Sequence, residues 1–533
     1  MGNISVVNMI PNSQSGETNQ DSEPNIAVNP ERPTDIVGTA LTPEPLGGPF
    51  APIYVSSDGG NTWDWRRVVP GSGMFGTKDI TVAFAPTGGA LFAAILDGAA
   101  ADRVLRILRT TNFTSTTPMT EITSSITGPD QPWIVPLAAP FGDRLYVGLN
   151  DLRSSFSATV HIFSNINSNS PGFTGKVLER RETEVSDGPP VRVAAHPDGT
   201  IYATFQRWSR AVGNKVGTTW KANVAFDVVV MRDDDFAGDI DKFYALVDAA
   251  DSEEGQRVVT NRYLFFNDTM GQERLGGDLA IAVDPSDSAT VWVAWCERVG
   301  LAGGTDWTLQ VARSKNRGRY WDRILRTITN AKNPALAVNS DKLLGLAYQQ
   351  FTGTQWITQL ELTSDAWATA AETHVLHQAP SNTPSRAFFP YLGDYIRLLA
   401  VGRDFYGVFS GNNRPDIANF PSGVTYLRRA DWVNRVLLNT DGVTPVATSI
   451  DPFFFHWSPS RRWPISPIIP RSPITPRGPI IPRAPILPRA PIIPRGPIGP
   501  PGTVASTAPA TREPSRADMP GQRKPVPPTD LDL

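Results

Sequence analysis

The chain has 533 residues, more than a single domain usually contains, and its formal net charge of −3 gives no electrostatic case for binding nucleic acid or an anionic membrane. Its one cysteine, Cys296, excludes an intrachain disulfide framework and a thiolate metal cluster. Many of the 49 prolines lie beyond residue 458, and this shift in composition marks a separate carboxy-terminal segment.

The amino-terminal segment, MGNISVVNMIPNSQSG, lacks the basic and apolar regions of a secretory signal, and Val6 breaks the myristoylation pattern. No apolar run is long enough to cross a bilayer. We therefore expect a cytoplasmic protein with no membrane span, unless an unconventional route exports it.

Apolar strand-like segments recur seven times along the chain, and each is followed by a turn signal and a second strand. The segments are NIAVNP from Asn25, DITVAFAP from Asp79, DQPWIVPL from Asp130, PVRVAAHP from Pro190, DLAIAVDP from Asp278, NPALAVNS from Asn333 and GDYIRLLAVG from Gly393. Most spacings are about 50 to 60 residues, which suits a four-stranded propeller blade. The pattern predicts an all-β fold over residues 1–458, a β-propeller of seven blades with six as the alternative. The strand Asn3–Ile10 is left over, and it would remove a free sheet edge by closing the ring.

The turn SSDGGNTW, residues 56–63, combines two glycines suited to positive φ with an aspartate that can accept backbone N–H bonds. Its spacing resembles the Asp-box, or bacterial neuraminidase repeat, of sialidases and several other β-propeller families. A degraded copy, SKNRGRYW, begins at Ser314. The resemblance implies a structural role between the third and fourth strands of a blade. The residues concerned are Ser56, Asp58, Gly60, Trp63, Ser314, Gly318 and Trp321.

The starts of the inner strands and the ends of the second strands share one face of a propeller, opposite the third-to-fourth strand turns. Carboxylates on this face suit glycoside chemistry, in which one acid protonates the leaving oxygen. Arginines there suit an acidic sugar, because the guanidinium binds a carboxylate bidentately. The catalytic candidates are Asp130, Asp278, Tyr395 and Glu297. The substrate-binding candidates are Arg153, Arg207, Arg298, Arg414, Asp79, Asp151 and Trp133.

Over about residues 20 to 435, phrases such as DQPWIV and LGDYIRLLAV resemble inner strands of bacterial sialidase-like repeat proteins. For a true sialidase the resemblance implies three arginines on the substrate carboxylate, a tyrosine nucleophile with a glutamate partner, and an aspartate acid/base. The first-blade Arg-Ile-Pro motif of that family is replaced here by PNIAVNP. Two hypotheses stay open: a sialidase-like glycoside hydrolase acting on an acidic or other sugar, and a non-catalytic propeller scaffold that binds a glycan or a protein and is tethered by its proline-rich tail.

The sequence predicts no metal and no cofactor. The acidic run RDDDFAGDID, residues 232–241, lacks the spacing of an EF-hand loop. His374 and His377 have no third ligand in view for zinc.

Residues 459–502 repeat Pro-Ile-x-Pro-Arg-x with a period of six, and residues 503–533 have the composition of a disordered tail. Polyproline II turns once in about three residues, so the repeat places one arginine per period on the same edge. We expect a stiff cationic spacer. Its regular PxxP spacing also suits a protein or an acidic polymer as a partner.

Overall fold

The computed structural model is all-β: its described residues contain no α-helix and two short 3-10 turns, η1 (Asn12–Gln14) and η4 (Ile417–Asn419). The described residues are 2–42, 53–66, 79–97, 104–151, 157–168, 171–183, 187–216, 219–238, 242–265, 279–298, 307–384 and 392–460. The all-β prediction is therefore confirmed for these ranges. The proline-rich spacer beyond residue 460 and the tail 503–533 lie outside them.

The strands of the first half form antiparallel four-stranded sheets in chain order. The first is β2 (Ser22–Val28), β3 (Ile36–Leu41), β4 (Ile53–Ser56) and β5 (Asp64–Arg66). The second is β6 (Ile80–Phe84), β7 (Leu91–Asp97), β8 (Val104–Thr110) and β9 (Thr120–Thr127). The third is β10 (Pro129–Leu137), β11 (Arg144–Asp151), β12 (Ser157–Ser164) and β13 (Gly172–Val177).

The second half continues the same order. One group is β14 (Asp187–Ala195), β15 (Ile201–Val216), β16 (Thr219–Asp233) and β17 (Gln256–Phe265). The next is β18 (Leu279–Asp284), β19 (Asp287–Arg298), β20 (Trp307–Ser314) and β21 (Arg326–Thr329). The pair Tyr263 and Arg298 links these two groups. The following sheet is β22 (Ala331–Val338), β23 (Leu344–Phe351), β24 (Gln355–Thr363) and β25 (Glu372–Pro380).

The last large sheet is closed by the amino terminus. Its order is β26 (Arg397–Val401), β27 (Asp404–Asn412), β32 (Ile450–Ser458) and β1 (Asn3–Asn8), with β28 (Thr425–Tyr426) beyond β1. β1 runs antiparallel to β32, with Asn3 opposite Ser458 and Asn8 opposite Phe453. The leftover amino-terminal strand thus covers an edge that would otherwise be free, as expected.

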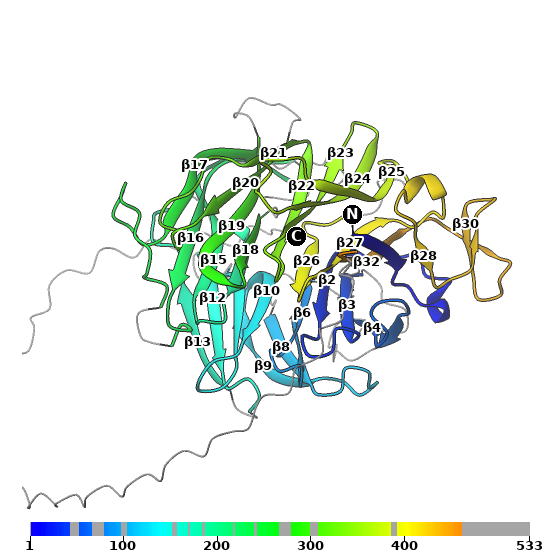
Figure 1. Cartoon of the computed structure of the whole chain (residues 1–533), viewed down its shortest axis with the longest axis horizontal. Helices are drawn as coiled ribbons and strands as arrows, with labels where there is room; N and C mark the ends of the chain where they lie inside the picture. The colour runs from blue at the N-terminus through cyan, green and yellow to red at the C-terminus, as the bar shows by residue number, and fades with distance from the viewer. Residues whose placement is uncertain are drawn as a thin grey trace, which may run out of the picture. The chain divides into compact units, whose positions relative to one another are not determined.

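The first strand of each sheet contacts the first strand of the next sheet around a ring (Figure 1). The contacts run from β2 to β6, β10, β14, β18, β22 and β26, and from β26 back to β2. Apolar side chains pack between neighbouring sheets, as where Phe92 and Leu105 meet Leu145 and Phe163. A closed cycle of antiparallel sheets around a centre is the architecture of a β-propeller.

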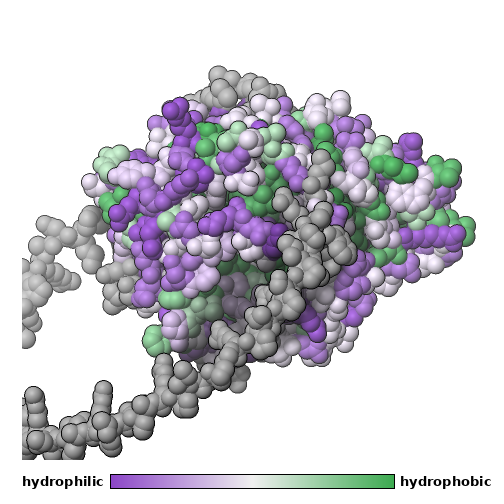
Figure 2. Space-filling view, in the orientation of Figure 1, coloured by the Kyte–Doolittle hydropathy of each residue, from purple (hydrophilic) through white to green (hydrophobic). Residues whose placement is uncertain are grey.

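A segment between β27 and β32 adds a small sheet of β29 (Ala430–Asp431), β30 (Val436–Leu438) and β31 (Pro445–Val446). Trp432 is 40%, Val433 90% and Val443 76% exposed on it. Figure 2 shows apolar atoms on this part of the surface, where Figure 1 labels β30.

A buried acidic cluster lies beside β1, and we define it as Glu17, Asp21 and Asp451. The Arg428 guanidinium pairs with the Asp451 carboxylate, and both side chains are inaccessible to solvent. The Asn8 side-chain amide donates to the same carboxylate at 2.7 Å. The cluster therefore connects β1, β32 and the segment that carries Arg428.

The turn at residues 56–63 lies between β4 and β5, the third and fourth strands of their sheet. The Asp58 carboxylate accepts bonds from the Thr62 backbone N–H at 3.0 Å and from the Thr62 hydroxyl at 2.6 Å. The Trp63 indole donates to the Gly60 carbonyl at 3.0 Å, and its ring packs against Phe454 of the closing sheet. The turn thus satisfies its own polar groups while its indole packs between sheets.

The same turn geometry recurs at two other third-to-fourth strand connections. The Ser314 hydroxyl accepts from the Gly318 N–H at 2.9 Å, and the Asn316 side chain takes the place of the aspartate. Between β24 and β25, the Thr363 hydroxyl accepts from the Trp367 N–H at 2.9 Å while Asp365 accepts from Thr369. The sequence pattern did not predict this third turn, because Thr363 and Trp367 replace the expected serine and glycine.

We expect Asp58→Ala to lower the free energy of unfolding by about 1 to 2 kcal/mol, because the turn loses its carboxylate acceptor. Urea unfolding measures the change. Asp64→Ala is the matched control, since Asp64 is 61% exposed and its ion pair with Arg66 is at the surface. Equal stability of the two variants would contradict the structural role of Asp58.

Candidate functional site

Three inner strands have, as their second or third residue, a residue in the left-handed region directly before a proline. The residues are Glu23 (φ 52°), Gln131 (φ 43°) and Asn333 (φ 50°), and a register shift in the ladder accompanies each. Non-glycine residues adopt this conformation at a cost of about 1 to 3 kcal/mol, and such strain gathers at functional sites. The strained residues therefore mark the end of the channel at which the inner strands start, which we call the mouth.

The three residues converge on the turn before β26. The Gln131 amide donates to the Asp394 carboxylate at 3.3 Å, and the Asn333 amide donates to the Gly393 carbonyl at 3.1 Å. The Glu23 carboxylate accepts from the Asp394 N–H at 3.2 Å. Strands from three separate sheets thus hold residues 393 and 394, and this fixes the position of the next residue, Tyr395.

The Tyr395 hydroxyl donates to the Asp79 carboxylate at 3.0 Å across the channel mouth. Tyr395 is 4% and Asp79 8% exposed. Burial, followed by the negative charges of Asp79 and Glu23, raises the pKa of Tyr395 well above its ordinary value. The phenol therefore stays protonated at neutral pH, and Asp79 is placed to accept its proton.

Two guanidinium groups pack on the indole of Trp133. The guanidinium carbon of Arg397 lies 3.9 Å and that of Arg192 lies 4.4 Å from the ring centroid. Burial and the neighbouring Arg192 charge lower the pKa of Arg397 to about 9. These side chains and Tyr395 line a cavity of about 250 Å³ between the inner strands, so the centre of the ring is cationic and aromatic.

The sequence reading did not include Arg192 and Arg397 among the site residues. Each stands inside an apolar inner-strand segment, PVRVAAHP or YIRLLAVG, where a strand buried on both faces has no place for an unpaired charge. A charged residue in such a segment was the signal available.

The structure places four predicted residues at the mouth. Tyr395 and Asp79 are in contact, Trp133 lines the cavity, and Asp130 lies buried at the start of β10 beside Gln131.

Of the other predicted residues that the structure describes, Glu297, Arg298 and Arg207 contact other groups. The Glu297 carboxylate accepts from the indole of Trp295 at 2.8 Å and pairs with Arg262 at 3.4 Å. The Arg298 guanidinium lies 5.9 Å from the Trp307 ring centroid. Asp151 ends β11 and Arg414 is exposed. Asp278 and Arg153 lie outside the described residues.

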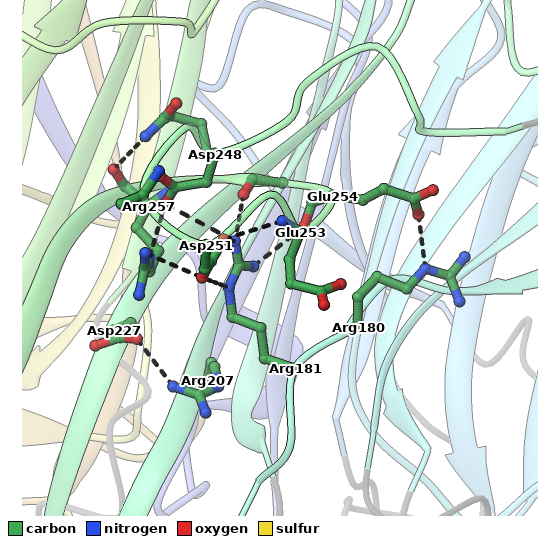
Figure 3. A network of polar contacts seen from close by, with 12 residues as sticks. Arg180, Arg181, Arg207, Asp227, Asp248, Asp251, Glu253, Glu254 and Arg257 are labelled. Carbon is green, nitrogen blue, oxygen red and sulfur yellow. Dashed lines mark hydrogen bonds and ion pairs between the residues drawn. The ribbon is translucent and has the colours of Figure 1, made fainter.

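Arg207 lies in a network of ion pairs (Figure 3). Its guanidinium pairs with Asp227 at 3.0 Å, directly opposite on β16, and donates to the Glu182 carbonyl. In the same network, Arg181 binds Asp251 at 2.7 Å. The network ties the segment before β14 to the residues before β17, so the charge of Arg207 is already compensated by protein groups.

Among the described residues, no group of three histidine, cysteine, aspartate or glutamate side chains is arranged to hold a metal ion. The same part of the chain holds no helix of the length and hydropathy that a membrane crossing requires.

No protein-family model matches the chain, and no curated protein matches it. Solved structures similar to it include an α-L-arabinofuranosidase of Fusarium graminearum in complex with arabinobiose, at 12% identity and TM-score 0.38, covering 68% of this chain and 98% of that chain. An α-L-arabinanase of Penicillium chrysogenum has 12% identity and TM-score 0.41, covering 85% and 98%. The phage phi92 endosialidase has 9% identity and TM-score 0.40, covering 87% and 70%. Likenesses at these scores do not assign an activity.

Proposed function

We propose that the protein is a glycan-directed β-propeller that hydrolyses a glycosidic bond at its mouth. The observation that carries this proposal is the contact between the Tyr395 hydroxyl and the Asp79 carboxylate, at 3.0 Å. A hydroxyl held against a carboxylate base is the arrangement of an activated nucleophile. The cationic and aromatic surroundings suit a sugar with an acidic group.

In the proposed reaction Asp79 accepts the phenolic proton as the Tyr395 oxygen attacks the anomeric carbon. The bond from that carbon to the leaving oxygen breaks, and a carboxylic acid at the mouth gives this oxygen a proton. Asp130 is the candidate for this acid. Water then attacks the anomeric carbon and gives a proton to Asp130, the bond to the tyrosine oxygen breaks, and Asp79 returns its proton to that oxygen. The Arg192 guanidinium, 5.6 Å from the Tyr395 ring centroid, favours the negative charge that develops on the phenolic oxygen.

The proposal includes seven blades. The cyclic contacts of β2, β6, β10, β14, β18, β22 and β26 support this count, since each of these strands is the first of its own antiparallel group.

The second candidate is a non-catalytic propeller that binds a glycan or a protein. The low exposure of both Tyr395 and Asp79 favours it, because a reacting sugar must reach the phenolic oxygen. A screen of chromogenic glycosides run beside a glycan array separates the candidates. Turnover supports the hydrolase, and binding without turnover supports the second candidate. The absence of both turnover and binding on a broad panel would contradict both candidates.

A further inference from the structure

A second cavity, of about 510 Å³, lies between the inner strands β2, β6, β10 and β26. Its walls are the apolar stretches 26–28, 82–84, 135–138 and 399–401. Its rim includes Pro30 and Pro197, which are exposed and follow the ends of inner strands. The cavity therefore opens at the end of the channel opposite the mouth.

Among the described residues that line this cavity, Arg397 is the one that carries a charge. Its Nε and Nη1 atoms are buried and have no hydrogen-bond partner among the described residues. A guanidinium binds a carboxylate along either of two edges. The Nε atom belongs to one edge and the Nη1 atom to the other. Burying a cation with unsatisfied donors is costly unless an anion compensates it.

The neighbouring charge of Arg192 makes the need for an anion greater. Arg192 packs on the same indole as Arg397, so two cations share Trp133 within the channel. The packing on the ring satisfies part of the guanidinium face but none of its N–H groups. An anionic group at Arg397 would satisfy those donors and reduce the repulsion between the two arginines.

We propose that this cavity binds a small organic monocarboxylate with an apolar body. The carboxylate lies on the Arg397 guanidinium, and the apolar body lies between the walls that lead to the proline rim. A cavity of about 300 to 1,000 Å³ with apolar walls and a few fixed polar groups is typical of small-molecule sites. The site requires no glycoside chemistry and does not depend on the hydrolysis proposed for the mouth.

Calorimetric titration of the full chain with hexanoate, acetate and hexanol tests the proposal. Hexanoate should bind more tightly than acetate, by up to about fourfold for each added methylene, because the walls desolvate the alkyl chain. It should bind at least about tenfold more tightly than hexanol, which cannot form charge-assisted bonds with Arg397. Absence of hexanoate binding at millimolar concentration, or equal affinity for hexanol, would overturn the proposal.

Two variants and one control variant locate the site. Arg397→Gln should abolish the preference for hexanoate over hexanol. Arg403→Gln should retain it, because Arg403 is 62% exposed in the turn after β26 and pairs with Asp341, which is 44% exposed. Val401→Phe adds a larger side chain to the cavity wall. It should lower the affinity for hexanoate and leave the affinity for acetate unchanged. This last variant keeps the test decisive if Arg397→Gln fails to fold, and unchanged hexanoate affinity in it would contradict the assigned walls. Glycoside turnover is a separate readout, so failure of one proposal is distinguishable from failure of the other.

Discussion

Tyr395→Phe is expected to lower kcat at least about 100-fold on any glycoside that the parent chain hydrolyses. The change removes the phenolic oxygen that forms the bond to the sugar and keeps the ring that packs near Trp133. Proton transfer to a positioned base contributes about 10² to 10⁴-fold in rate, so its loss alone sets the lower bound. Steady-state kinetics measures the effect.

Tyr348→Phe is the matched control for this variant. Tyr348 is 2% exposed, and its hydroxyl donates to the Glu361 carboxylate at 2.9 Å, away from the mouth. Both variants lose one buried hydrogen bond to a carboxylate, so both should lose about 1 to 3 kcal/mol of stability. Only Tyr395→Phe should lose turnover. Full activity of Tyr395→Phe would exclude tyrosine as the nucleophile.

Arg428→Met is expected to lower the free energy of unfolding by about 3 to 5 kcal/mol at pH 7, as breaking a buried ion pair usually does. The change leaves Asp451 buried without its cation, next to two further carboxyl groups of the buried acidic cluster. Urea unfolding measures the loss. Arg403→Gln is the control, because Arg403 is 62% exposed and its partner Asp341 is 44% exposed.

The decrease in the free energy of unfolding caused by Arg428→Met should be smaller at acidic pH. Burial, followed by the charge of Asp451, raises the pKa of Asp21 to about 7, and burial also raises the pKa of Glu17. A carboxyl whose pKa is higher in the folded chain than in the unfolded chain stabilises the fold at low pH. This contribution falls as the pH rises from about 4 through 7. Asp21→Asn should flatten that fall. A destabilisation by Arg428→Met that is the same at pH 5 and pH 8 would contradict this account.

The repeated strands could be predicted because their signals are local. Each inner strand is a short apolar segment, and turns such as residues 56–63 carry their own hydrogen-bond partners within the motif. The pairing of the amino-terminal strand could also be predicted, because a repeat pattern that leaves one strand over requires a free sheet edge as its partner.

The charges were harder to place because they depend on register and ring closure. Arg207 has the spacing of a second-strand end, yet only the pairing of β15 with β16 places Asp227 opposite it. Arg192 and Arg397 belong to different sheets, and the closed ring brings both onto Trp133. The separation of residues 192 and 397 along the sequence does not predict that both contact the same ring.

The pairing of β1 with β32 also sets an order of events during synthesis. Asn3 and Ser458 are opposite each other, so β1 has no partner until nearly all of the described strands have been translated. Closing so long a loop adds little entropy beyond that of a shorter one, but contacts so distant in sequence form slowly. The earlier sheets can stack on one another as they emerge, while the final sheet waits for its last strand. Docking of β1 on β32 is therefore the expected late step of folding.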